Sequence, residues 1–224
     1  MQSSDLLQKS IRYVFDDNSY LQQALTHPSY ANEHHIDKCF TNQRLEFLGD
    51  AVLELVSSDF LYRKYDSADE GTLTKNRASL VCEETLSNIA RELKLYDYLL
   101  IGNGEDRNFL KNNNSTMCDT LEAIIGAIYI DGGIENARSF IKSFILCEAN
   151  LTHTSFDYKT VLQELANKNK YKLIYELVDE YGPDHNKTFV INAHFGDKVL
   201  TKGVGKSKKE AEQNAAKAAL EIIK

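Results

Sequence analysis

The sequence lacks the features that would place it in a membrane or on a secretory route. No apolar run approaches the roughly 18 residues that a helix needs to cross a bilayer. The first ten residues, MQSSDLLQKS, contain no basic stretch followed by an apolar one, so we expect no signal peptide. These absences predict a protein that has no membrane partner.

Cysteine is scarce and irregularly spaced. The four cysteines stand at positions 39, 82, 118 and 147, with no CxxC pair and no short ligand spacing between them. The spacing therefore predicts neither a zinc knuckle nor a disulfide framework. Free thiols are typical of the cytosol, so we expect a cytoplasmic protein.

Charge is unevenly divided along the chain. Residues 1–157 hold 14 Lys+Arg against 24 Asp+Glu, a balance of −10, and residues 158–224 hold 12 Lys against 9 Asp+Glu, a balance of +3. The two balances add up to the net charge of −7. Such a division favours two modules with different partners, although +3 alone could also be scatter.

The hydrophobic pattern changes between the two parts. Apolar spacing near 3.6 residues predicts helices within 45–62, 73–93, 117–130 and 134–148, with a long polar loop at 102–116 and a linker at 150–157. Beyond the linker we expect a helix at 158–170, strands at 171–180, 187–195 and 198–205, and a helix at 206–224 capped by Ser207. The sequence thus predicts an all-α domain at 1–150, followed by a small α+β domain of order α-β-β-β-α at 154–224.

The stretch LEFLGDAVLEL, residues 45–55, places three acids four residues apart on one face of a predicted helix, at Glu46, Asp50 and Glu54. Like charges at this spacing repel one another, and Gly49 costs a further ~1 kcal/mol in a helix interior. A solvated face is the commoner explanation for such acids. Here the remaining residues are apolar nearly all round, which predicts a core helix whose carboxylates need a cation.

A second apolar stretch, CDTLEAIIGAIYIDGG, carries Asp119 and Glu122 at its start. Acids in a first helical turn are also favoured by the helix dipole, which is the simpler explanation for one helix alone. Two apolar helices that each carry acids could instead pack together and gather four carboxylates. Oxygen ligands of this kind suit magnesium or manganese, which can assist phosphodiester hydrolysis.

These motifs resemble those of one family. NQRLEFLGDAVLEL closely resembles the signature helix of ribonuclease III, CDTLEAIIGAIYIDGG its second catalytic helix, and DEGTLTKNRASLV the helix between them. GVGKSKKEAEQNAAKAA resembles the end of a double-stranded-RNA-binding domain. The resemblance covers nearly the whole chain and implies an all-α ribonuclease III endonuclease domain followed by a double-stranded-RNA-binding domain.

The resemblance implies roles for individual residues of the first domain. Glu46 and Asp119 would be metal ligands, and Asp50 and Glu122 would be both ligands and catalytic residues. Glu54 matches no functional position of the family, so we expect it to be a surface charge near a helix end.

Three further positions of this domain match the family. Glu70 and Gln43 would support the site, Gln43 standing where many relatives have Glu. Phe47 would lie at a dimer interface, although core packing explains a phenylalanine equally well.

The resemblance also implies the residues that contact RNA. Thr160, Gln163 and Glu164 match minor-groove positions of the first helix, and His185 matches the histidine that enters the next minor groove. The last helix begins beside a lysine cluster, Lys206, Lys208 and Lys209. An ordinary capped helix would explain these lysines too, and Glu212 stands where many such domains have lysine.

The implied function is a homodimeric, magnesium-dependent endoribonuclease that cuts double-stranded RNA, with manganese as a substitute cation. Its products would carry 5′-phosphate and 3′-hydroxyl ends with short 3′ overhangs, and its substrates would include ribosomal RNA precursors and structured messenger RNAs. The alternative is an RNA-binding protein that retains the fold without cleavage, although all four acids are present. A helical phosphohydrolase with a His-Asp dyad is disfavoured, because the chain has no His-Asp dipeptide.

Overall fold

The computed structural model describes residues 4–66, 68–147, 158–183, 187–196 and 198–223. The chain divides into two compact units, residues 1–63 with 77–154 and residues 64–76 with 155–224, and each is described by itself. The predicted boundary between residues 150 and 154 lies outside the described residues, so it stays a prediction. Among the described helices, none is long and apolar enough to cross a membrane.

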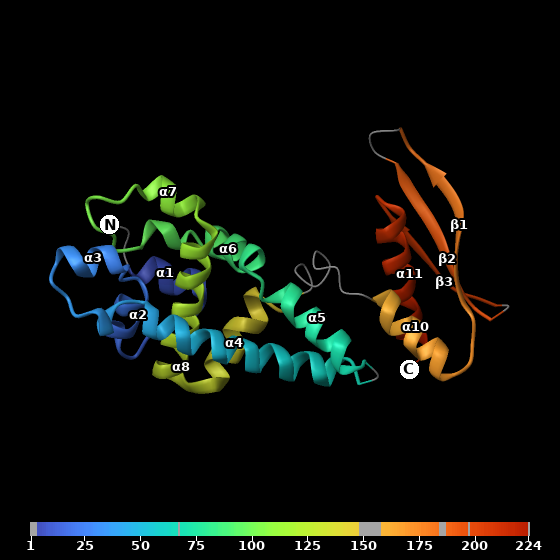
Figure 1. Cartoon of the computed structure of the whole chain (residues 1–224), viewed down its shortest axis with the longest axis horizontal. Helices are drawn as coiled ribbons and strands as arrows, with labels where there is room; N and C mark the ends of the chain where they lie inside the picture. Colours follow the sequence, from blue (N-terminus) through green and yellow to red (C-terminus); the bar gives the residue numbers. More distant parts are fainter. Residues whose placement is uncertain (1–3, 67, 148–157, 184–186, 197, 224) are drawn as a thin grey trace. The chain divides into compact units, whose positions relative to one another are not determined.

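The first part of the chain is helical (Figure 1). Its elements are α1 (Ser4–Ile11), α2 (Asn18–Ala24), α3 (Pro28–Glu33), η1 (Lys38–Phe40), α4 (Gln43–Lys64), α5 (Glu70–Leu80), α6 (Glu83–Glu92), η2 (Leu95–Asp97), α7 (Arg107–Asn112) and α8 (Asn114–Phe144). The polar loop expected at 102–116 therefore contains α7 and the start of α8. The helix expected at 73–93 is two helices, because extended backbone at Cys82 separates α5 from α6.

Helix α4 buries a single stripe of side chains. Its buried residues recur at three- and four-residue spacing, as expected for an amphipathic helix: Leu45, Gly49, Val52, Leu53, Val56, Ser57 and Leu61. Phe47 is 80% exposed and Leu55 60% exposed on other faces of the helix. The prediction of a core helix buried nearly all round is therefore wrong.

Helix α8 supplies much of the core. Thirteen of its residues are buried, among them Leu121, Ile124, Ile125 and Ile128. Its backbone breaks at Gly133, where φ is +76°, between the two apolar segments that the sequence predicted. Glycine adopts a positive φ more readily than other residues do, which accounts for the position of this break.

The second domain has the predicted order of elements, α10 (Tyr158–Lys168), β1 (Leu173–Tyr181), β2 (Thr188–Phe195), β3 (Lys198–Gly205) and α11 (Lys208–Ile222). The strands form one antiparallel sheet of order β1-β2-β3. Figure 1 shows both helices on one side of this sheet. Leu162, Ala216 and Ala219 are fully buried in the core between the helices and the sheet.

Glycines in β3 allow α11 to lie close against the sheet. A Cβ atom at Gly203 would stand 2.1 Å from the carbonyl oxygen of Ala211, and one at Gly205 would stand 2.5 Å from its amide nitrogen. Thr201 adds a hydrogen bond from its hydroxyl to the Ala215 carbonyl, 2.7 Å long. The start of α11 is thereby fixed at the end of β3.

Candidate active site

The four acids that the sequence selected come from α4 and α8, which cross at two glycines. A Cβ atom at Gly49 would lie 1.8 Å from the carbonyl oxygen of Glu122, and one at Gly126 would lie 2.1 Å from the carbonyl oxygen of Leu45. No side chain fits at such distances, so the two backbones approach as closely as glycine allows. The free-energy cost of a glycine inside α4 therefore has a structural reason, because this crossing brings Glu46 of α4 near Glu122 of α8.

Burial and neighbouring negative charge raise the pKa values of three of these carboxylates. Burial, followed by the negative charges of Asp119 and Asp50, raises the pKa of Glu46. Burial, followed mainly by the charge of Asp50, raises the pKa of Glu122 to about 7. Burial also raises the pKa of Asp119, although Ser115 donates a hydrogen bond to it at 3.4 Å and partly opposes the shift.

The described residues place no cationic side chain in an ion pair with any of the four acids. Glu46, Asp119 and Glu122 are half-buried, whereas Asp50 is exposed. Partly buried carboxylates of like charge are costly unless a cation compensates them. The chemistry of this donor set fits a divalent metal ion held by oxygen ligands.

Sequence reasoning missed two further groups beside these acids. Cys118 is only 8% exposed, and its thiol donates a hydrogen bond to Glu122 Oε1 at 3.6 Å. Burial raises the pKa of Asp119 and of Cys118, and the negative charge of Glu83, in the first turn of α6, adds to both shifts. Cysteine spacing could not reveal Cys118 as a neighbour of the site, because its partners are not cysteines. They are the acids one and four residues further along the same helix.

Glu54 is not the helix-end surface charge that we expected. It lies well inside α4 and forms an ion pair with Arg77 of α5, with 2.8 Å between Oε2 and Nε. Arg77 also donates a hydrogen bond to the Ser58 hydroxyl at 2.9 Å. Glu54 therefore joins the last turn of α5 to α4.

The two supporting residues stand at helix starts. Gln43 is the first residue of α4 and is exposed, and Glu70 is the first residue of α5 and accepts a hydrogen bond from Thr74 at 3.0 Å. Their support of the site stays a prediction.

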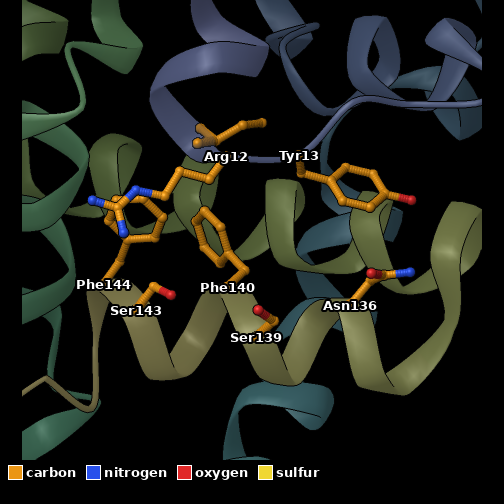
Figure 2. A pocket seen from close by; sticks show the side chains of 8 residues that line it. Arg12, Tyr13, Asn136, Ser139, Phe140, Ser143 and Phe144 are labelled. Atoms are coloured by element: carbon orange, nitrogen blue, oxygen red, sulfur yellow. The ribbon is translucent and has the colours of Figure 1, made fainter.

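A pocket elsewhere in the first unit contains none of the predicted site residues (Figure 2). It lies between the end of α1 and the second half of α8, and Arg12 lies over the Phe144 ring at 5.5 Å from its centroid. Figure 2 shows Ser139 and Ser143 along its α8 side. The acidic cluster thus does not occupy this pocket, and its exposed Asp50 suits a ligand that approaches from outside.

The second domain presents its predicted RNA-contacting residues on two helices. Gln163 is exposed on α10, beside the half-buried Thr160 and Glu164. Lys206, Lys208 and Lys209 are exposed at the start of α11. His185 lies outside the described residues.

The predicted cap of α11 is confirmed. The Ser207 hydroxyl accepts a hydrogen bond from the Glu210 amide at 3.1 Å, and the Glu210 carboxylate accepts one from the Lys206 amide at 2.7 Å. Glu212, which stands where many relatives have lysine, pairs instead with Lys159 of α10. It therefore joins the two helices of the domain.

Comparison with known proteins identifies the class. Residues 17–149 match the ribonuclease-III-like family model, and residues 158–223 match that of the double-stranded RNA binding motif. The chain belongs to the ribonuclease III family, whose members are metal-dependent endoribonucleases that cleave double-stranded RNA.

Named relatives support this membership along nearly the whole chain. A Ribonuclease 3 of Caldanaerobacter subterraneus is 45% identical over 218 residues, covering 96% of this chain and 95% of that protein. One of Carboxydothermus hydrogenoformans is 46% identical over 222 residues, covering 97% and 94%. The crystal structure of the nuclease domain of the Campylobacter jejuni enzyme matches 65% of this chain and 95% of its own with a TM-score of 0.59 and 41% identity.

Proposed function

We propose that Glu46, Asp50, Asp119 and Glu122 form the active site of this endoribonuclease and hold magnesium, with manganese as a substitute. The observation that supports this is the gathering of four carboxylates at a glycine-lined helix crossing, with no cationic side chain paired to them among the described residues. A bound divalent ion would supply Lewis acidity toward a phosphodiester and its attacking water.

The residues of the chain have distinct tasks in this proposal. The half-buried Glu46 and Asp119 are fixed by their helices and hold the ion in place. Asp50 is exposed and would be the first of the four acids to meet an approaching RNA strand. Glu122 is half-buried and lies near Asp50, so it would connect this exposed ligand with the half-buried ones. By resemblance to the family, Gln43 would support these groups through hydrogen bonds, and Glu70 would have a supporting role.

The second domain acts as the RNA anchor. A-form RNA is bound mainly through 2′-hydroxyls and phosphates across a shallow minor groove. Thr160, Gln163 and Glu164 would contact the minor groove from α10, and His185 would contact the next one. Lys206, Lys208 and Lys209 would contact the phosphates between them, which fits their exposure at the start of α11.

The protein works as a homodimer through the exposed face of α4. Phe47, Leu55 and Tyr62 are 80%, 60% and 73% exposed and lie on one side of the helix. Exposed apolar patches of this kind mark protein–protein contacts. The related nuclease domain of Campylobacter jejuni has a structurally flexible region that is involved in dimer formation.

Light scattering at micromolar concentration should give twice the 25.4 kDa chain mass, and a monomer mass would count against the dimer.

Each strand of the duplex would be cut once, leaving 5′-phosphate and 3′-hydroxyl ends with a short 3′ overhang. The substrates would be ribosomal RNA precursors and structured messenger RNAs in the cytoplasm.

The test is incubation of the purified protein with a long RNA duplex, with and without magnesium. We expect short duplex products only when the metal is present, and single-stranded RNA of the same length should remain uncut. Tight duplex binding without cleavage in magnesium would favour the alternative, an RNA-binding protein that does not cut.

A further inference from the structure

Cys118 is a soft ligand beside the proposed magnesium site. Its sulfur, an Asp119 carboxylate oxygen and a Glu122 carboxylate oxygen all lie within 4.8 Å of one another. Cys118 is more than nine-tenths buried, and its thiol is directed at Glu122 Oε1. The thiol therefore faces the acids rather than solvent.

The spacing of two of these atoms suits a tetrahedral ion. Zinc binds thiolate sulfur at about 2.3 Å and carboxylate oxygen at about 2.0–2.2 Å, so tetrahedral ligands of these two kinds lie roughly 3.6 Å apart. The distance between Cys118 Sγ and Glu122 Oε1 is 3.6 Å. One ion could thus contact both atoms without a change of backbone.

The three ligands are also preorganised. They occupy positions i, i+1 and i+4 of a single helix, so no loop has to close for them to meet. The contact of Gly126 with the Leu45 backbone fixes this part of α8 against α4. An ion that binds here therefore incurs little conformational cost.

We propose that Cys118, Asp119 and Glu122 form a site for thiophilic divalent cations, zinc or cadmium, that overlaps the magnesium site and excludes magnesium from it. On binding, the thiol S–H bond breaks, its proton passes to solvent, and a metal–sulfur bond forms without any change of oxidation state. Magnesium gains nothing from sulfur, whereas zinc and cadmium do. This inference rests on the proposed function, because the overlap requires Asp119 and Glu122 to be magnesium ligands.

The direct test is a cadmium titration of the full-length, metal-free protein, followed by the ultraviolet charge-transfer absorption of cadmium bound to thiolate. We expect a band that saturates near one equivalent, disappears in Cys118→Ser and weakens in Asp119→Asn. Cys147→Ser is the matched control, since it removes a second thiol, one that is only partly buried, and it should keep the band. A band that survives Cys118→Ser, or that is unaffected by Asp119→Asn, would overturn the site.

A second measurement gives the functional consequence. Zinc is titrated into magnesium-dependent cleavage, and each rate is divided by that variant's own zinc-free rate. The zinc concentration that halves the rate should be about tenfold or more higher in Cys118→Ser and Cys118→Ala than in wild type. Equal zinc sensitivity would refute the overlap. Absence of cleavage before zinc is added would refute the proposed function instead, and the cadmium band would remain a separate test.

Discussion

Glu122 combines two properties at the scale of the residue. It lies at the helix crossing, and burial together with the charge of Asp50 raises its pKa from 4.5 to about 7. A raised carboxyl pKa means that the folded protein binds this proton more tightly than the unfolded chain does. Its ionisation therefore opposes folding, and the stability of the metal-free protein should fall as the pH rises from about 4.5 to about 7.

Glu122→Gln should stabilise the metal-free protein at pH 8. The amide removes one negative charge from the cluster and keeps the shape of the side chain, so we expect a gain on the order of 1 kcal/mol, or roughly 2–4 °C in Tm. Magnesium should raise the Tm of the wild type and have much less effect on the variant.

The measurement is thermal unfolding in chelator and in magnesium at pH 5 and pH 8. Glu92→Gln makes the same change at an exposed position at the end of α6 and should behave as wild type. A Glu122→Gln protein that is less stable than wild type in chelator at pH 8 would contradict the raised pKa.

At the scale of the element, the crossing of α4 and α8 determines whether the acids meet. Gly49→Ala would place a methyl group 1.8 Å from the Glu122 carbonyl, and backbone cannot yield as a flexible side chain can. We expect a loss of roughly 1–3 kcal/mol of stability, as for overpacking, and a loss of the magnesium-induced rise in Tm. Denaturant unfolding measures the first effect, and thermal unfolding with and without magnesium measures the second.

Gly104→Ala is the matched control for this change. A Cβ atom at Gly104 would meet nothing within 4 Å, so its stability should change by less than about 0.5 kcal/mol. Equal stability of Gly49→Ala and Gly104→Ala would show that the helices do not approach as closely as described.

The sequence predicted the elements better than their contacts. The helices bearing Glu46 and Glu122, the separate apolar segments at 117–130 and 134–148 and the α-β-β-β-α order all followed from local patterns, because periodicity is a local property. The exposure of Phe47 did not, since an apolar residue has the same appearance in a sequence whether it faces the core or a partner. The position of the Cys118 thiol beside the acids could not be predicted from the sequence either, because it depends on where three side chains of one helix are directed.

At the scale of the whole molecule, chemistry and RNA anchoring belong to different domains. A fragment that ends near residue 150 keeps the four acids and should still cut duplex RNA, but only at low salt. The first 157 residues carry a charge of −10, which repels phosphate, and the fragment lacks Lys206, Lys208 and Lys209. Removing one lysine–phosphate interaction should reduce the salt dependence of binding by roughly one unit of slope.

Binding and cleavage of both proteins across a salt series would measure this division. The full-length chain should bind more tightly throughout and show the steeper decline in affinity with salt. Equal affinity of the two proteins at physiological salt would mean that the second domain is not the anchor.

The assignment of the acidic cluster to cleavage is tested most directly by measuring single-turnover cleavage and duplex binding side by side for Glu122→Gln. Loss of a ligand charge should lower the cleavage rate in magnesium by at least about a hundredfold, because changes to groups beyond the direct ligands already cost roughly 10–100-fold. Duplex affinity in a gel-shift assay should stay within about twofold of wild type, since the lysines at the start of α11 are unchanged. Cleavage at the wild-type rate with unchanged binding would show that Glu122 is not part of the active site.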